Sequence, residues 1–297
     1  MSRISQEVGK IEKRLLGWKK DKFDARDYKM KLSPPDTKIP DKVDLRSQFP
    51  PVYNQDLSDC TANASVGGIC RDLMQENLPK DNSIVTLSRL FQYYNSRLVD
   101  QQNGDGSTND DNGSYLRSAL SAANKYGVCS EKLWPYEDTS NKYKIEPSKS
   151  AYEDAKKYKV DQYFRVGSLF DAKVALSHGY PIVCGIPVYS ECFETEIAKT
   201  HGVIPNPPQN KTLEGGHAIC LVGFSTSDGV FIFRNSWSSS WGDGGYGYLS
   251  DGYMKEADDL WAIVHVTDPS SVGIEVIVPS TGNIFAKIWN WIKSIFA

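Results

Sequence analysis

The chain has 297 residues, and its 40% apolar content supports one or two folded domains and excludes a disordered chain. Its 34 Lys and Arg against 37 Asp and Glu give a net charge of −3, which provides no overall basic field, so we expect no nucleic-acid partner. No apolar run approaches the roughly 20 residues that span a bilayer, and the N-terminal residues lack the apolar core of a secretory signal. We therefore expect no transmembrane segment, and a protein that is cytoplasmic in the producing cell or packaged in a particle.

Residues 1 to 41 are interpreted as a leader before the folded body. Apolar residues at helical intervals predict a short amphipathic helix over residues 4 to 16. The Pro-containing stretch LSPPDTKIP predicts an extended linker, so the body begins near Lys42. Residues 1 to 30 carry nine Lys and Arg against five Asp and Glu, whereas the rest of the chain is acidic. The leader is thus either a solvated terminus or a segment that folds back onto the oppositely charged body.

The first half of the body is predicted to be mainly helical. A buried helix begins near Cys60, and small residues that follow it allow another element to pack closely. Two more helices are predicted, from Leu87 to Leu98 and from Ser114 to Tyr126. These helices form a predicted lobe over residues 42 to 158.

The second half of the body, residues 159 to 268, is predicted to be a lobe of antiparallel strands. A helix is predicted from the pattern DAKVALSHG over residues 171 to 179. Short β-branched and aromatic runs, separated by turn residues, then predict the strands; these runs are YPIVCGIPV, HAICLVGF, GVFIFRNSW, GYGYLS and LWAIVHV. A helical half followed by a β half predicts an α+β protein with a cleft between its lobes.

The tail, residues 269 to 297, ends in NIFAKIWNWIKSIFA, which sets its apolar residues on one face of a predicted amphipathic helix. A helix of this kind packs on its own body, or it docks on a partner or a membrane surface. It is too short to cross a bilayer.

Six cysteines in a chain of this length do not require a disulfide framework. No CxxC pair occurs, and the closest Cys and His neighbours, His217 and Cys220, lack the second half of a zinc site. We therefore expect no metal and no other cofactor, and we ask whether one thiol carries out chemistry.

Three separated residues together meet the needs of a thiol nucleophile. Cys60 lies at a predicted helix start, whose positive end favours the thiolate, and His217 lies on a predicted strand and supplies a neighbouring cation. Asn235, at a strand end, can orient the imidazole without neutralising it. Gln55 lies five positions before Cys60, so its side-chain amide and the Cys60 backbone N–H can both point at a developing oxyanion.

These pieces resemble the papain-like cysteine peptidases, the clan that includes the cathepsins. The resemblance runs in order from KVDLRSQFPPVYNQ to LWAIVHV, and RNSWSSSWGDGGYGYL is its most specific motif. It implies a two-lobed fold with a β-barrel-like second lobe and the active site in the cleft. It also implies Cys60 as nucleophile, His217 as general acid and base, Asn235 as orienter and Gln55 as oxyanion donor.

The resemblance implies further site residues around this set. Trp237 shields the hydrogen bond between His217 and Asn235, with Trp241 packed nearby. The residues implied to contact the substrate are, besides Trp237, the backbone pair Gly113 and Ser114, the pocket residue Ala218 for the second residue before the cut, and the apolar floor Ile263.

The sequence also departs from the family pattern. Thr61 replaces the usual Trp, the loop from Gln55 to the nucleophile is one residue shorter, and Asp59 places a carboxylate directly before Cys60. Gly216 replaces an acidic or polar residue before the histidine. These changes resemble bacterial and viral outliers, and they bear on specificity more than on catalysis.

We therefore predict a thiol peptidase that hydrolyses peptide bonds of peptide or protein substrates through a thioester on Cys60. The alternatives are a catalytically inactive peptide-binding relative, and acyl transfer or peptidoglycan cleavage by the same residues. The leader is shorter than a family pro-region, but as in a zymogen it is a candidate intramolecular inhibitor, with residues such as Phe23 to Tyr28 over the cleft.

Overall fold

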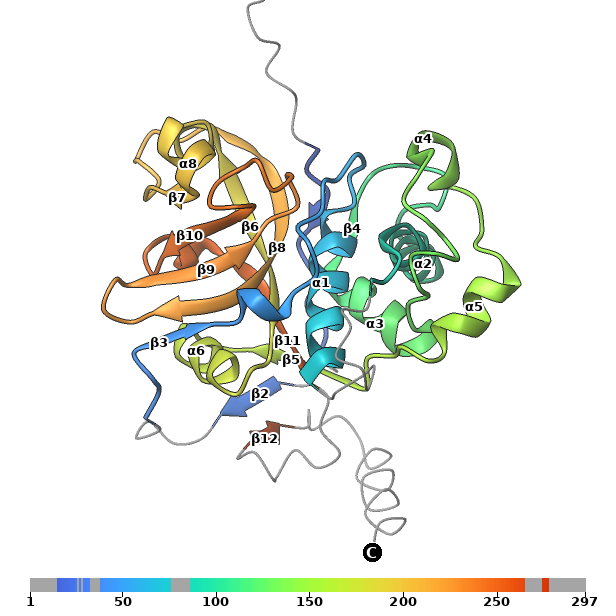
Figure 1. Ribbon diagram of the computed structural model, residues 1–297, viewed down its shortest axis with the longest axis horizontal. Coiled ribbons are helices and arrows are strands. Elements are labelled where there is room, and N and C mark those ends of the chain that lie inside the picture. Colours follow the sequence, from blue (N-terminus) through green and yellow to red (C-terminus); the bar gives the residue numbers. More distant parts are fainter. Residues whose placement is uncertain are drawn as a thin grey trace, which may run out of the picture.

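A helical lobe and a sheet lobe lie side by side in the computed structural model (Figure 1). The structure describes residues 15–25, 27, 29–32, 38–75, 86–264 and 274–277. Helices dominate the first half of the body and strands the second, so the predicted α+β class is confirmed.

The helical lobe is formed mainly by three helices, α1 (Cys60–Gln75), α2 (Arg89–Gln102) and α3 (Leu116–Tyr126). The short helices α4 (Thr139–Lys142) and α5 (Lys149–Ala155) follow. The start of α2 is fixed by Ser88, whose hydroxyl oxygen accepts a hydrogen bond from the Phe91 backbone N–H at 3.0 Å. α1 contacts α2 and α3 on one side and the sheet on the other, so it forms the boundary between the lobes.

The sheet lobe contains one large sheet with the strand order β12-β2-β5-β11-β6-β8-β9-β10-β7, and β3 also pairs with β8. Its strands are β2 (Lys29–Leu32), β3 (Lys42–Asp44), β5 (Gln162–Val166), β6 (Ile182–Tyr189), β7 (Val203–Ile204), β8 (Leu213–Ser225), β9 (Val230–Arg234), β10 (Tyr246–Ser250), β11 (Asp258–Val264) and β12 (Ile274–Ile277). Among these pairs, β2 with β5 and β7 with β10 run parallel, and the others run antiparallel. The described strands form an open path rather than a closed barrel.

Short helices cover the sheet and connect its strands. They are α6 (Leu169–Ser177), α7 (Ser190–Phe193) and α8 (Glu196–His201), together with the 3-10 turns η1 (Arg46–Gln48) and η2 (Tyr253–Glu256). Buried apolar side chains from α1, β6, β8 and β11 belong to one cluster. The core is therefore continuous across the boundary between the lobes, which holds α1 against the sheet.

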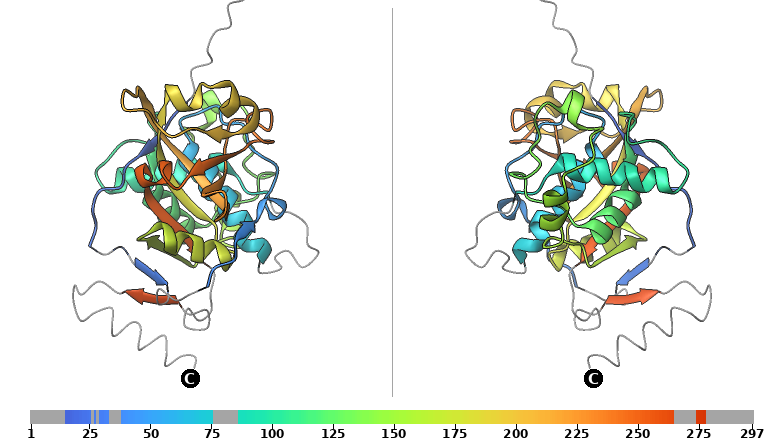
Figure 2. Two further views of the ribbon diagram at one scale, coloured as in Figure 1. Left: turned by 90° about the vertical axis from the view of Figure 1, so that its left-hand side faces the viewer. Right: turned by 90° about the vertical axis from the view of Figure 1, so that its right-hand side faces the viewer.

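Segments from both ends of the chain join this architecture. In the leader, β1 (Trp18–Lys19) pairs in parallel with β4 (Ser114–Tyr115), the short strand that directly precedes α3 in the chain. Further along, β2 pairs with β5, and β12 from the tail pairs antiparallel with β2. Figure 2 shows β2 and β12 together at one end of the molecule. The leader thus contacts the body at two separate places.

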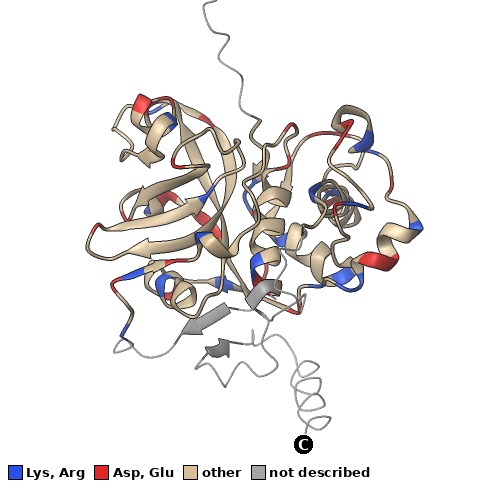
Figure 3. Ribbon diagram, viewed as in Figure 1, with Lys and Arg blue, Asp and Glu red and all other residues tan. Residues whose placement is uncertain are grey.

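Two predicted helices lie largely outside the described residues. Of the helix predicted over residues 4 to 16, only Leu15 and Leu16 are described, and they are not helical. The amphipathic helix predicted at the end of the tail falls entirely outside. Within the described part of the chain, no helix is long and apolar enough to cross a membrane. Figure 3 shows Lys and Arg interspersed with Asp and Glu along both lobes.

Candidate active site

Cys60 is the first residue of α1 and is fully buried. The start of a 16-residue helix leaves backbone N–H groups unpaired and carries a partial positive charge, which favours a thiolate. Burial nevertheless raises the pKa of Cys60 to about 12, and the nearby Ala218 and Gly17 backbone groups only partly offset this effect. Burial of the covered sulfur therefore favours the neutral thiol over the thiolate.

His217 is held by Asn235 under an aromatic cover. His217 Nε2 lies 2.9 Å from Asn235 Oδ1, and the Ser236 backbone N–H donates to the same oxygen at 2.8 Å. An amide oxygen only accepts hydrogen bonds, so Nε2 carries the hydrogen and Nδ1 is the basic nitrogen of the neutral ring. The Trp237 ring stacks on the imidazole with centroids 4.5 Å apart, and Trp241 packs edge-on against Trp237.

Gln55 is tied to the same strand end through Ser236. The Ser236 hydroxyl donates to Gln55 Oε1 at 2.5 Å, and the Gln55 backbone N–H donates to the Ser236 carbonyl oxygen at 2.9 Å. These two bonds fix the Gln55 amide so that its N–H groups face away from Ser236. Sequence reasoning did not single out Ser236, although it follows Asn235 directly in the most specific motif.

The Gln55 side-chain N–H groups are both engaged. Nε2 donates to the carbonyl oxygen of Leu57 at 3.0 Å and to that of Leu15, in the leader, at 2.7 Å. A carbonyl from the leader therefore occupies the position where the sequence predicted an oxyanion to be bound. The structure brings the four predicted site residues together at the boundary between the lobes; they are Cys60, His217, Asn235 and Gln55.

The leader pairs along the edge of β4 next to Cys60. The Ser114 backbone N–H donates to the Gly17 carbonyl oxygen at 3.0 Å, and Trp18 is in register with Ser114. The fit is close, because a Cβ on Gly113 would lie 1.8 Å from the Gly17 oxygen. Gly113 also has a φ of 73°, which a residue with a Cβ rarely adopts. The predicted backbone pair Gly113 and Ser114 thus lies against an extended chain.

Trp18 lies over two glycines of the sheet. An ideal Cβ on Gly185 would come within 1.9 Å of its indole ring, and one on Gly216 within 2.6 Å. The expectation that Phe23 lies over the cleft is wrong, because Phe23 is 89% exposed. Residues 15 to 18 cover the cleft instead. A lone aromatic at position 23 gives no information on this long-range contact.

The two remaining predicted substrate residues, Ala218 and Ile263, are both buried. Ala218 follows His217 on β8, is buried, and presents its backbone to the Cys60 sulfur. Ile263 is also fully buried, and its Cδ1 lies against α1 at Gly68, two helical turns beyond Cys60. The contacts of Trp18 are instead with Gly185 and Gly216.

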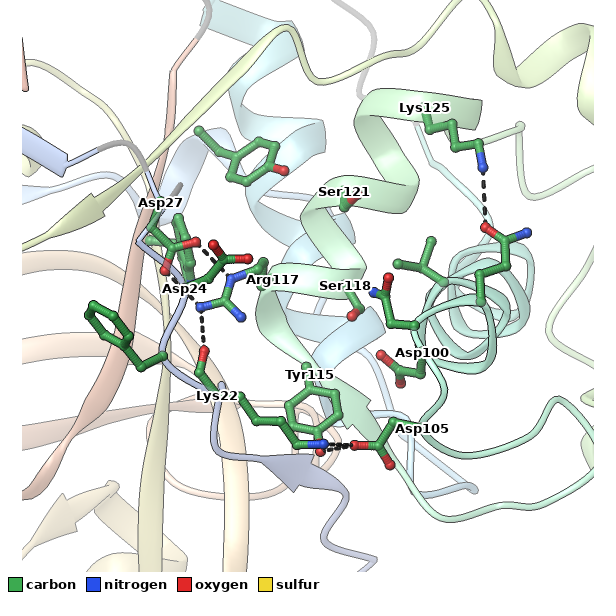
Figure 4. A pocket seen from close by; sticks show the side chains of 16 residues that line it. Lys22, Asp24, Asp27, Asp100, Asp105, Tyr115, Arg117, Ser118, Ser121 and Lys125 are labelled. Atoms are coloured by element: carbon green, nitrogen blue, oxygen red, sulfur yellow. Dashed lines mark hydrogen bonds and ion pairs between the residues drawn. The ribbon is translucent and has the colours of Figure 1, made fainter. Parts of the chain in front are cut away.

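A cavity lies beside the leader and away from Cys60. This cavity of about 680 Å³ is lined by leader residues and by α2 and α3, and Figure 4 shows ion pairs at its edges. Lys22 Nζ donates to Asp105 at 2.7 Å, and Arg117 pairs with Asp27 at 2.7 Å. The leader fills the space over Cys60, which explains why the hollow lies elsewhere. In the described ranges, no group of three or more His, Cys, Asp or Glu could hold a metal ion.

Asp59, the residue before the nucleophile, is fully buried. Burial raises the pKa of its carboxyl to about 7, and the Arg89 guanidinium and the Tyr136 hydroxyl lower it by less. The nearby charge of Asp111 also raises it. When ionised, Asp59 raises the pKa of Cys60. A carboxyl at this position is therefore compatible with a reactive thiol mainly while it stays protonated.

Comparisons with known proteins agree with this geometry. Residues 39–259 match the family model described as papain family cysteine protease. The chain is 35% identical over 226 residues to an uncharacterized peptidase C1-like protein of Acanthamoeba polyphaga mimivirus, covering 72% of this chain and 69% of that protein. Xylellain, a cysteine protease from Xylella fastidiosa, has a similar crystal structure, with a TM-score of 0.75, 32% identity and coverage of 88% of this chain and all of the other. Digestive procathepsin L 3 of Tenebrio molitor shares the fold, with a TM-score of 0.58 and 19% identity over 80% of this chain and 74% of the other.

The raised pKa of Asp59 predicts a specific dependence of stability on pH. An unfolded carboxyl releases its proton near pH 3.8, whereas the folded one holds it up to about pH 7. Rising pH between these values therefore favours the unfolded chain. Between pH 5 and pH 8, Asp59 should lower the free energy of unfolding by about 3 kcal/mol, because one pKa unit corresponds to about 1.4 kcal/mol. We expect this pH-dependent decrease to be absent in Asp59→Asn.

The measurement is the midpoint of thermal unfolding at pH 5 and pH 8 for the wild type and the variant. Asp110→Asn, on an exposed carboxyl, serves as the control and should follow the wild type. Parallel pH dependence of the wild type and Asp59→Asn would contradict the assignment of a protonated, buried Asp59.

Proposed function

The chain belongs to the papain family of cysteine proteases, and we propose that it hydrolyses peptide bonds through a thioester formed on Cys60. The thiolate of Cys60 attacks the carbonyl carbon, and His217 gives its proton to the leaving amine as the C–N bond breaks. A water molecule then attacks the thioester, His217 takes its proton, and the acid and the thiolate are released. The observation that carries this proposal is the Asn235–His217 hydrogen bond under Trp237, next to the start of α1.

Asn235 orients the imidazole in this proposal. Its carbonyl oxygen fixes the hydrogen on Nε2, so that Nδ1 is the atom that exchanges the proton. Because the amide is neutral, it holds the ring without removing the positive charge that stabilises the thiolate. The stacked Trp237 ring keeps water from competing for the Nε2 hydrogen bond.

Gln55 donates to the developing oxyanion. The same Nε2 that now bonds the Leu15 carbonyl is a donor held in place by Ser236, and a fixed donor costs no reorganisation as charge develops. Ser236 is a positioning residue in this scheme, since its hydroxyl contacts Gln55 and not the reacting atoms.

The leader inhibits the enzyme by occupying this site. Leu15 takes the Gln55 donor, Gly17 takes the Ser114 backbone N–H, and Trp18 covers the two sheet glycines. A substrate strand needs the same groups, so leader and substrate exclude each other. The raised pKa of the buried Cys60 thiol is in keeping with this inhibition.

A second contact holds the leader in place. The Asp21 carboxylate is fully buried, lies 3.0 Å from the Arg165 guanidinium, and accepts a hydrogen bond from Trp261 Nε1 at 2.9 Å. Asp27 pairs with both Arg165 and Arg117. Breaking such pairs would leave buried charges without partners, which costs several kcal/mol. Leader lysines also pair with body carboxylates, but those pairs are exposed, whereas the buried anchors are leader carboxylates on body arginines.

A labelling experiment tests the chemistry and the inhibition together. The full-length wild type, Trp18→Ala, Phe23→Ala and Cys60→Ala are exposed to a peptidyl epoxide, and adducts are followed by intact mass. We expect labelling of Trp18→Ala to be at least about 30-fold faster than that of the wild type, since removing this half-buried indole costs about 2 to 3 kcal/mol of docking. Phe23→Ala, altered at an exposed leader residue, should match the wild type, and Cys60→Ala should not react.

Equal rates for the wild type and Trp18→Ala would discard the inhibition while keeping the enzyme. No adduct on any folded variant would discard Cys60 as an activated thiol.

A second experiment separates donation from positioning at Gln55. In the Trp18→Ala background, we expect Gln55→Ala to lower kcat on an internally quenched peptide by about 100-fold, because it removes an oxyanion donor. Ser236→Ala should lower kcat by about 10-fold with little change in KM. Since Ser236 acts through Gln55, the double variant should be no slower than Gln55→Ala alone. Fully additive losses would show that Ser236 acts independently.

A further inference from the structure

The loop from Gln55 to Cys60 connects the two lobes. Its first residue is held to the sheet lobe, because Gln55 bonds Ser236 through both its backbone and its side chain. Its last residue begins α1 in the helical lobe. The residues between them belong to no helix or strand, so their backbone is held in place by other contacts.

Asp111 holds the middle of this loop. The Ser58 backbone N–H donates to both oxygens of its carboxylate, at 3.0 Å to Oδ1 and 3.2 Å to Oδ2. The hydroxyl of Tyr93, a buried residue of α2, donates to Oδ1 at 2.6 Å. The same hydroxyl oxygen accepts a hydrogen bond from the Gly113 backbone N–H at 3.2 Å. Asp111 and Tyr93 therefore connect Ser58 to Gly113, and we call these two side chains the bridge.

Ser58 and Gly113 form the two walls of a narrow slot, through which the leader passes at Gly17. A Cβ on Gly17 would lie 1.8 Å from the Ser58 carbonyl oxygen, and a Cβ on Gly113 would lie 1.8 Å from the Gly17 carbonyl oxygen. Real Cβ atoms do not approach other atoms this closely, so the slot is only as wide as an extended backbone. Because the bridge connects both walls, it sets this width.

The bridge is supported by Arg97. This residue is buried, and its guanidinium lies 4.0 Å from the centre of the Tyr93 ring. Its Nη1 donates to the carbonyl oxygens of Thr108 and Asp110, at 2.6 Å and 3.0 Å. The backbone that leads into Asp111 is therefore fixed, and the Arg97 charge attracts the carboxylate.

The width of the slot bears on the proposed reaction because one wall belongs to the loop that carries the oxyanion donors. Gln55 and the Cys60 backbone N–H lie at the two ends of this loop. Gly113 and Ser114 contact the chain in the cleft from the other wall. A carbonyl group held by one wall is thus placed against donors on the other. An error of about 1 Å in such an arrangement can slow a reaction by about 100-fold.

We propose that Asp111 is a positioning residue, which fixes the width of the slot together with Tyr93 and so places the oxyanion donors relative to a bound peptide. This inference rests on the proposed function and adds a residue that supports the same site. A carboxylate suits the role, since it accepts hydrogen bonds from both walls at once. Asp111 touches no reacting atom, so its loss should slow turnover and leave the Cys60 thiol reactive.

The test uses full-length protein with Trp18→Ala, in which the leader is weakened, and an internally quenched peptide. We expect Asp111→Ala to lower kcat by about 30-fold and to change KM by less than about 3-fold, because a shifted loop misplaces the donors without removing the backbone contacts of the peptide. Asp111→Asn keeps Oδ1, the atom that accepts from both Ser58 and Tyr93. It should therefore retain kcat within about 3-fold, which separates the acceptor from the charge.

Tyr93→Phe tests the other half of the bridge. It removes the hydroxyl that joins Asp111 to Gly113 and keeps the ring that packs under Arg97. We expect kcat to fall by about 5-fold or more, and the double variant with Asp111→Ala should be no slower than Asp111→Ala alone, because the two side chains act as one unit. Fully additive losses would contradict a shared bridge.

Asp110→Asn is the matched control, because this neighbouring carboxyl is exposed, and it should keep the kcat of its background. Epoxide labelling of Cys60 then separates positioning from general damage to the fold. The epoxide alkylates the thiol without forming an oxyanion on a carbonyl carbon, so Asp111→Ala should be labelled within about 3-fold of its background. An unchanged kcat in Asp111→Ala, or an equal loss of kcat and of labelling, would overturn the inference. Absence of both cleavage and labelling in the background protein would instead overturn the proposed function.

A second measurement does not depend on peptide cleavage. In the otherwise wild-type chain, Gly17→Ala should speed epoxide labelling of Cys60 by at least about 10-fold, because a Cβ at this position overlaps the Ser58 carbonyl oxygen. In an Asp111→Ala chain, the wider slot should admit the added methyl group, so the same change should speed labelling by less than about 3-fold. Equal accelerations in the two chains would show that Asp111 does not set the width of the slot.

Discussion

The site depends on the packing of α1 against β8. This contact brings the N-terminus of a helix, with Cys60, to the strand that carries His217 and Ala218. The approach is close because α1 carries glycine where it meets the sheet: a Cβ on Gly68 would lie 3.7 Å from the Cys220 sulfur on β8 and 2.8 Å from Ile263 Cδ1 on the nearby β11. Side chains there would push the helix outward and separate thiol from imidazole. The rest of the fold, including the continuous core, serves to hold this one contact.

The local parts of this arrangement are predictable from the sequence. The helix beginning near Cys60 starts at that residue, and the strand with His217 covers the predicted run and extends beyond it. The helix predicted over 87 to 98 is observed as Arg89–Gln102, because Ser88 supplies a cap that sets the start. Periodicity and capping residues act over a few positions, so they carry this information directly.

The long-range contacts are not predictable in the same way. Leu15 reaches Gln55 across 40 residues, and nothing in its neighbourhood marks it as a ligand of a side-chain amide. Charge suggested that a basic leader folds onto an acidic body, and leader lysines do pair with body carboxylates at the surface, yet the buried anchors are Asp21 and Asp27 on body arginines. Net charge describes attraction between segments but does not identify the groups that meet. Ser236 was missed for a related reason, since a hydroxyl gains its role only when Gln55 is beside it.

Inhibition and substrate binding are linked because they need the same groups. On the proposed function, the leader and a substrate compete for Ser114, the Gln55 donor and the surface under Trp18. The leader has the advantage of being covalently attached, so its effective concentration at the site is high. Its side chain can therefore fit imperfectly, with an unpaired indole N–H, and still exclude a substrate until the anchors at Asp21 and Asp27 are broken.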